Sequence, residues 1–213
     1  MSAPGPQAEG GDPLAPLLLP VLVHRLNNAT QLLSNLDAVL RVGGERDWLA
    51  ERSSDLGDSA HDVHELGYVL AVLASASGAD LLLARREPAG LAYMLRVVAS
   101  CAAREGRGFE LPGELPELAP EVHAGWELAW AAAALLCLAT LALPEGEGLD
   151  WSIAEEGSGW ALRCSGEFPA ACSELRPRLA ERLPGSRIAV GEGEWSWWIP
   201  GDWLLRPSER ARA

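Results

Sequence analysis

The chain has 213 residues, of which 48% are hydrophobic and 22% charged, so it is long enough to bury a core as one domain or two small ones. Its formal net charge of −13 argues against nucleic acid and anionic membrane surfaces as partners, because both attract clustered Lys and Arg. A protein or a small molecule is the expected partner.

The chain termini are predicted to be tails, at residues 1–12 and 208–213. The first 12 residues are acidic, rich in Pro and Gly, and lack the basic flank of a secretory signal. The longest apolar run, residues 128–143, is shorter than a membrane-spanning helix of 18 or more residues, which predicts a buried helix. Four cysteines without Cys-x-x-Cys spacing are predicted to be buried thiols of a reducing, cytoplasmic compartment: Cys101, Cys137, Cys164 and Cys172.

A strongly patterned helix is predicted from Val21 to Val42, with a stop signal at residues 43–44. Regular helix is expected to start near Pro20, with a shorter or kinked helical piece before it. Spacings of three and four alternate along its apolar residues, which is typical of a helix that buries a seam against partner helices: Leu19, Leu22, Leu26, Ala29, Leu33, Leu36 and Leu40. At about 100° per residue, the opposite side carries four polar residues that are expected to face solvent: His24, Asn27, Asn28 and Gln31.

A second helix is predicted from Asp47 to Ala76, joined to the first by a short glycine turn, so that residues 13–78 form an antiparallel helical hairpin. The same spacing recurs along its apolar residues: Leu56, Ala60, Val63, Gly67, Leu70 and Ala74. A lone hairpin leaves an apolar face uncovered, which favours pairing of two copies into a four-helix bundle in a homodimer. His61 and His64 share one helical side but have no third ligand cluster, so no metal site is predicted.

Residues 79–207 are predicted to form a second domain with an α+β layer, in which helices cover one face of a mixed sheet. The expected elements are a helix at 83–106, an edge strand at 108–113, a loop at 114–122, a helix at 122–143, a β-hairpin at 149–157 and 159–166, a helix at 172–183, and a closing hairpin at 186–193 and 194–201. Four tryptophans near the end are expected to fill the core and contribute part of an interface: Trp195, Trp197, Trp198 and Trp203.

The run His24-Arg25-Leu26-Asn27-Asn28, followed by a leucine-rich helix, resembles the H box of bacterial sensor histidine kinases. In that family an exposed histidine on the first helix of a dimeric four-helix bundle carries a phosphoryl group. The resemblance implies that His24 is the phosphoacceptor. Residues 79–207 are similar in element order to the ATP-binding domain of the same kinases, which implies a histidine-kinase-type ATPase α/β sandwich after the hairpin.

The nucleotide-binding residues of that family are absent. Ala134 and Leu138 stand where paired asparagines would hold magnesium, and Gly166 replaces the adenine-binding aspartate. No glycine loop precedes the helix at 172–183, and Glu192 in the Gly-Glu-Gly turn would repel phosphate. Because phosphoryl transfer from ATP needs Mg²⁺ ligands and a phosphate cradle, we expect a degenerate domain with no cofactor and no autophosphorylation.

A phosphoacceptor helix with a degenerate ATPase-like domain resembles the histidine phosphotransferases of multistep phosphorelays. The resemblance implies that His24 takes a phosphoryl group from a receiver-domain aspartate and passes it to another, with response-regulator receivers, including those of hybrid sensor kinases, as partners. The receiver would supply Mg²⁺, and the neutral imidazole would be the nucleophile.

The other three polar H-box residues, Arg25, Asn27 and Asn28, differ in what they imply. Arg25 occupies the position of the family's acidic base, cannot accept a proton and could attract phosphate oxygens. Asn28 coincides with the family position that holds the water for receiver dephosphorylation, and Asn27 and Asn28 are expected to orient the phosphoryl group.

Two other interpretations stay open. The chain could be a non-catalytic pseudokinase, a dimeric scaffold that binds a receiver or a kinase and blocks or organises it, with His24 incidental. A weaker third interpretation, resting on Asn28, is a phosphatase for a receiver.

Overall fold

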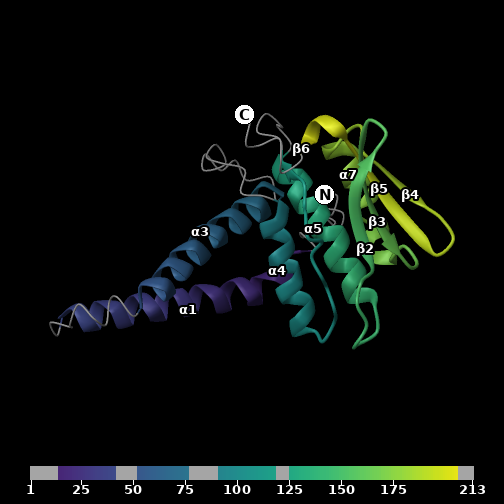
Figure 1. Cartoon of the computed structure of the whole chain (residues 1–213). Coiled ribbons are helices and arrows are strands. Elements are labelled where there is room, and N and C mark those ends of the chain that lie inside the picture. The colour runs from purple at the N-terminus through teal and green to yellow at the C-terminus, as the bar shows by residue number, and fades with distance from the viewer. Residues whose placement is uncertain (1–13, 42–51, 77–90, 119–124, 206–213) are drawn as a thin grey trace, which may run out of the picture.

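The computed structural model describes residues 14–41, 52–76, 91–118 and 125–205. They form an α+β structure in which a hairpin of two long helices, α1 and α3, projects from a body of helices and an antiparallel sheet (Figure 1). The two hairpin helices diverge toward the body, where α1 packs on α4 and α3 packs on α5. The α+β class predicted from the sequence is confirmed at this level.

The first hairpin helix, α1, spans Ala15–Arg41 and starts earlier than predicted, with Pro20 inside it. Proline cannot donate the backbone hydrogen bond to the residue four positions earlier, so an interior proline destabilises a helix. Here Leu14 and Leu18 are fully buried and anchor the first turns against the body, and this packing offsets the missing bond. The predicted end at Val42 and the stop at residues 43–44 lie outside the described residues.

The second hairpin helix, α3, spans Ser53–Ala76. Its end agrees with the prediction, whereas its start does not: Arg52 is a turn residue, and residues 47–51 lie outside the described part of the chain. Arg52 forms an ion pair with Asp55 at 2.8 Å across the first helical turn. The Asp55 carboxylate, in the first turn, also interacts favourably with the positive end of the helix dipole, which stabilises the start of α3.

The buried face of the hairpin is rotated from the predicted seam. Leu22 and Ala29 are buried as predicted, whereas Leu26 is 49% exposed. The buried apolar residues of the two helices are Leu14, Leu18, Val21, Leu22, Ala29, Leu66, Val69, Val72 and Leu73. The exposed ones, all from the predicted seams except Val23, are Leu19, Val23, Leu26, Leu33, Val63 and Leu70; we call this set the apolar stripe. The prediction that the whole repeat faces inward is therefore wrong for the single chain, because α4 and α5 draw the other face into the core.

Two central helices connect the hairpin to the sheet. Helix α4 spans Leu91–Arg104 and α5 spans Gly125–Ala142, whose residues from Leu128 to Cys137 are all buried. One hydrophobic core runs from the base of the hairpin through these helices to the sheet. Among the described residues, no helix combines the length and the apolar character needed to cross a bilayer.

The main sheet has four strands in the order β2-β3-β5-β4: Trp151–Glu156, Gly159–Ser165, Glu194–Pro200 and Arg187–Val190. Both predicted β-hairpins are present, but every pairing in this sheet is antiparallel, so the prediction of a mixed sheet is wrong. The pairs β2–β3 and β4–β5 are local hairpins, which are antiparallel by construction, and β5 runs back antiparallel beside β3. Alternation turns Leu162 and Trp197, which are register partners, toward the core.

Two smaller predictions need correction. Residues 108–113 do not form the predicted edge strand. Phe109 stacks on Trp151, and the indole of Trp151 donates to the Glu110 carbonyl at 2.9 Å. The first strand is instead β1, Glu117–Leu118, which pairs with β6, Leu204–Leu205. The helix predicted at 172–183 is broken into α6, Ala170–Ser173, and α7, Arg176–Arg182. Pro177 causes the break, since it fits the first turn of a helix but not the interior.

The cysteine and tryptophan predictions can be compared with burial. All four cysteines are buried free thiols, as predicted. Trp195 and Trp197 are at most 2% exposed and belong to the core, whereas Trp198 and Trp203 are partly buried. The short 3₁₀ helix Gly201–Trp203 then leads into β6. Core packing of the tryptophans is confirmed for the two that face inward.

Candidate functional site

His24 is exposed on α1, three turns into the helix and clear of the buried face. Val21 and Leu22, three and two residues earlier, are buried, and they fix the rotation of α1 about its axis. His24 is displaced from Leu22 by about 200° around the helix, which turns the imidazole to solvent. The position predicted for His24 from periodicity is therefore the one it takes.

Asn28 lies one turn beyond His24 and contacts it directly. The Nδ2 atom of Asn28 is 3.4 Å from Nε2 of His24, and both side chains are exposed. An amide nitrogen can only donate, so Nε2 can accept in this contact in the tautomer that carries the ring proton on Nδ1. Asn27 is exposed as well, but within the described part of the chain the contact with the ring comes from Asn28, so the two asparagines are placed differently.

Arg25 projects toward α4 and not along the His24 side. Its guanidinium donates from Nη1 to the hydroxyl of Tyr93 and from Nη2 to the hydroxyl of Ser100, each at 3.3 Å. The guanidinium of Arg96, on the same helix, lies 5.3 Å from the centre of the Tyr93 ring. The residue after the candidate phosphoacceptor therefore ties α1 to α4, a role that the sequence did not predict.

A signal for this tie exists in the sequence. Tyr93 and Ser100 are seven residues apart, so they lie on one side of α4 about two turns from each other. Polar groups on a helix side that is otherwise apolar need partners, and Arg25 supplies them. Sequence reasoning missed the tie because nothing in the pattern states which helix packs beside α1.

Two positions that the kinase resemblance compares with nucleotide-binding residues lie together. Gly166, with φ of 101°, follows β3, and its N–H donates to the carbonyl of Gly193 at 2.8 Å. Both glycines close turns at the same end of the sheet, since Ser165 and Glu194 are register partners. Ala134 is fully buried in the core, and Leu138 is partly buried. These side chains offer no oxygen ligand.

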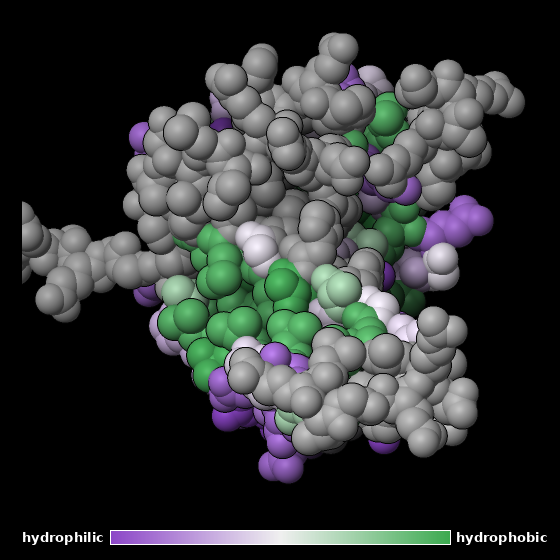
Figure 2. Space-filling model, turned by 90° about the vertical axis from the view of Figure 1, so that its left-hand side faces the viewer, coloured by the Kyte–Doolittle hydropathy of each residue, from purple (hydrophilic) through white to green (hydrophobic). Residues whose placement is uncertain are grey.

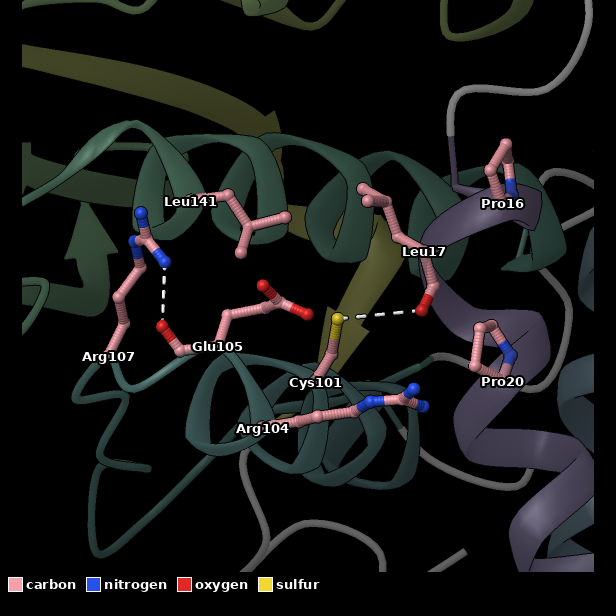
Figure 3. Close-up of a pocket in the computed structure, with 8 residues that line it drawn as sticks. All are labelled: Pro16, Leu17, Pro20, Cys101, Arg104, Glu105, Arg107 and Leu141. Carbon is pink, nitrogen blue, oxygen red and sulfur yellow. Dashed lines mark hydrogen bonds between the residues drawn. The ribbon is translucent and has the colours of Figure 1, made fainter. Parts of the chain in front are cut away.

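A cavity of about 340 Å³ lies between α1, α4 and the end of α5 (Figure 3). The thiol of Cys101 donates to the carbonyl of Leu17 at 3.6 Å on its wall, and the carboxylate of Glu105 points into the space between Cys101 and Arg107. Arg107 donates to the Leu143 carbonyl at 2.8 Å and to the Glu105 carbonyl at 2.7 Å, which secures the chain after α4. The polar groups of Cys101 and Arg107 in the cavity wall are therefore already bonded to backbone carbonyls.

The buried thiols are not equivalent. A hydrogen bond with the Cys137 thiol lowers the pKa of Cys101, and the same bond together with burial raises the pKa of Cys137. Burial raises the pKa of Cys164, and it raises the pKa of Cys172 to about 12. Of the four, Cys101 is thus the thiol most able to ionise.

Within residues 14–41, 52–76, 91–118 and 125–205, no group of three or more His, Cys, Asp or Glu side chains is placed to hold a metal ion. The side chains of His61 and His64 are not among those described.

Comparison with protein-family models and with curated protein sequences gives no match for this chain. The functional assignment must therefore come from the residues around His24 and their geometry.

Proposed function

We propose that the protein is a histidine phosphotransferase, with His24 as the residue that carries the phosphoryl group between receiver domains. The observation that carries the proposal is the exposed imidazole with its Nε2 atom 3.4 Å from the amide of Asn28. A phosphocarrier histidine must be open to a protein partner and must present a ring nitrogen with a free electron pair. In the tautomer with its proton on Nδ1, Nε2 has such an electron pair and can accept the N–H of Asn28.

The transfer step needs little from this chain. The Nε2 lone pair attacks the phosphorus of a receiver aspartyl phosphate, the N–P bond forms as the P–O bond to aspartate breaks, and the aspartate leaves with the electron pair as a carboxylate. Asn28 can then donate its amide N–H to a phosphoryl oxygen in place of Nε2. The partner supplies Mg²⁺, and positioning of the two reactants contributes most of the rate enhancement.

A homodimer forms part of the proposal. The apolar stripe contains six exposed Leu and Val side chains, with exposed fractions from 42% to 55%, along both hairpin helices. Figure 2 faces the hairpin end of the molecule and shows hydrophobic side chains gathered into a connected area. Exposed apolar patches of this kind mark protein contact sites. A second copy of the hairpin, with the same spacing of three and four, would cover the stripe in a four-helix bundle.

The second candidate is the dimeric scaffold without phosphoryl chemistry. It is favoured by Arg25, which occupies the position next to His24 and is committed to Tyr93 and Ser100 on α4. That arrangement serves packing of α1 on the body and does not involve the imidazole. In this case His24 would be an ordinary surface residue of the hairpin.

One experiment separates the two functions. Receiver domains from the source organism are charged with radiolabelled acetyl phosphate and mixed with the purified protein. We expect acid-labile, base-stable label on the wild type and none on His24→Ala, with label retained on Gln31→Ala as the matched control, because Gln31 is exposed on the same side of α1. Equal labelling of wild type and His24→Ala, or no label on either, would contradict the phosphotransferase.

A further inference from the structure

Three arginines line the junction of α1 and α4, and we call them the arginine seam: Arg25, Arg96 and Arg104. Arg25 crosses from α1 to Tyr93 and Ser100, each at 3.3 Å. Arg96 stacks on the ring of Tyr93, and Arg104 follows Ser100 by one turn of α4. Residues 96, 100 and 104 are each four apart, so they share one side of α4.

Charge is distributed unevenly over these two helices. Residues 15–36 of α1 and residues 91–104 of α4 contain three arginines and no Asp or Glu, although the chain has 30 acidic and 17 basic residues. Arg96 and Arg104 are exposed, while Arg25 is half-buried. The seam is therefore a basic strip on a strongly acidic protein, and its field is of the sign that attracts an anionic partner.

The seam lies next to the exposed side of α1 that carries His24. Arg25 is about 100° around the helix from His24, on the side that faces α4. The stripe leucines of α1, Leu19, Leu26 and Leu33, lie about 140–180° from His24, and Val23 lies about 100° from it in the direction away from Arg25. At the other end, Arg104 reaches from α4 toward Pro20, one turn before His24 on α1 (Figure 3). A partner seated over the imidazole thus meets the edge of α4, and a second copy bound to the apolar stripe does not cover it.

The small cavity at the end of the seam is a poor phosphate site. The Glu105 carboxylate points into it, and Arg107 is held by two backbone carbonyls. A phosphate there would meet a competing negative charge. A protein surface that spans the seam would instead engage the arginines from outside while its phosphoryl group reaches His24.

We propose that the arginine seam is the docking surface for the acidic rim around the phosphorylated aspartate of a receiver domain. The inference rests on the proposed function for the identity of the partner, and it adds α4 to a site otherwise confined to α1. Arg96 and Arg104 act by steering and orienting the partner, because exposed charges at the rim of an interface change association more than chemistry. They are positioning residues, since neither touches the reacting atoms.

The test reverses charge at the two exposed seam residues with Arg96→Glu/Arg104→Glu. The matched control is Arg163→Glu/Arg187→Glu on the sheet, which makes the same charge change and likewise loses one cation–π contact, that of Arg187 with Trp198. Arg163 gives up only an exposed ion pair with Glu156. Circular dichroism and thermal melting verify that both double variants fold.

Two readouts are measured with receiver domains from the source organism. The first is the KM and kcat of phosphoryl transfer from the receiver phosphorylated with acetyl phosphate, at low and high ionic strength. The second is binding of the beryllofluoride-activated receiver to proteins that also carry His24→Ala, which removes chemistry. We expect the seam variant to raise KM and Kd about tenfold relative to the control, to change kcat by less than about twofold, and to flatten the salt dependence.

The outcomes separate this proposal from the phosphotransferase. If phosphoryl transfer occurs and the seam variant has the same KM as the control, the docking role of the arginine seam is wrong and the phosphotransferase proposal stands. Loss of binding in the seam variant without any phosphoryl transfer by the wild type supports the seam on a scaffold and overturns the phosphotransferase. If no activated receiver binds the wild type, the seam proposal is wrong.

Discussion

The apolar stripe gives the sharpest quantitative test of the proposed dimer. The perturbation is Leu26→Ser/Leu33→Ser, at two stripe positions that are 49% and 55% exposed in the single chain. They lie seven residues apart on α1, so both face the same neighbour in a helical bundle. About half of each residue is exposed in the single chain, and this is the part that a second copy would bury.

The magnitude follows from the exposed fractions. Full burial of a leucine side chain is worth about 1.5–3 kcal/mol, so covering the exposed half contributes roughly 1 kcal/mol. In a symmetric dimer each substitution occurs twice, and four half-leucines correspond to about 4 kcal/mol of association free energy. Since about 1.4 kcal/mol is a factor of ten, the dimer Kd is expected to rise by roughly three orders of magnitude.

Sedimentation equilibrium over a range of protein concentrations measures this Kd. The matched control is Val190→Ser, because Val190 on β4 is 50% exposed and apolar but does not belong to the hairpin. We expect the control to dimerise like the wild type and the double variant to be monomeric at the same concentrations. A double variant with the Kd of the control, or a wild type that is monomeric throughout, would refute the reasoning that this stripe pairs two copies.

Three further predictions concern single residues. Gly159→Ala should lower the melting temperature by roughly 5–10 °C, because a β-carbon there overlaps the Ile199 carbonyl and the Trp198 ring, whereas Gly113→Ala, in open space, should leave it within about 2 °C in calorimetry. Burial raises the pKa of Cys172 to about 12, so its stabilising contribution is complete below the ordinary value of 9.0 and is lost as the pH rises toward 12; urea unfolding across this range should show a shallower decline for Cys172→Ala. Asn28→Ala should slow phosphoryl transfer about fivefold while His24 is still labelled, as expected for loss of one hydrogen bond, and an unchanged rate in quenched-flow assays would exclude a role for Asn28.

The elements with a clear period were predictable from the sequence. Alternation in β2 and β3, with glycines between them, gave the hairpin, and burial of Trp195 and Trp197 follows from the same period of two. The exposure of His24 follows from its angle to Leu22. In each case the spacing of residues within one short segment was enough to predict the pairing, burial or exposure that the structure shows.

Pairings between distant segments were not predictable in this way. The start of α1 depends on Leu14 and Leu18, whose burial requires the body of the protein to be in place, and local rules gave more weight to Pro20. β1 has two residues, too short for a periodic signal, and exists because Leu204 and Leu205 reach it. The link from Arg25 to α4 likewise depends on a helix that begins 50 residues after α1 ends.

The rotated seam of the hairpin explains how one helix can serve two partners. A single repeat of three and four residues places leucines on two neighbouring strips of α1, and the body of the same chain covers the strip of Leu22 and Ala29. The strip of Leu26 and Leu33 remains exposed, where the proposed second copy would pack, and the side that bears His24 faces neither the body nor this strip. A helix covered on three sides would bury the imidazole. Because the body covers one strip and leaves the other, dimerisation and access to His24 are compatible on the same helix, which a functional phosphoacceptor in a dimeric bundle requires.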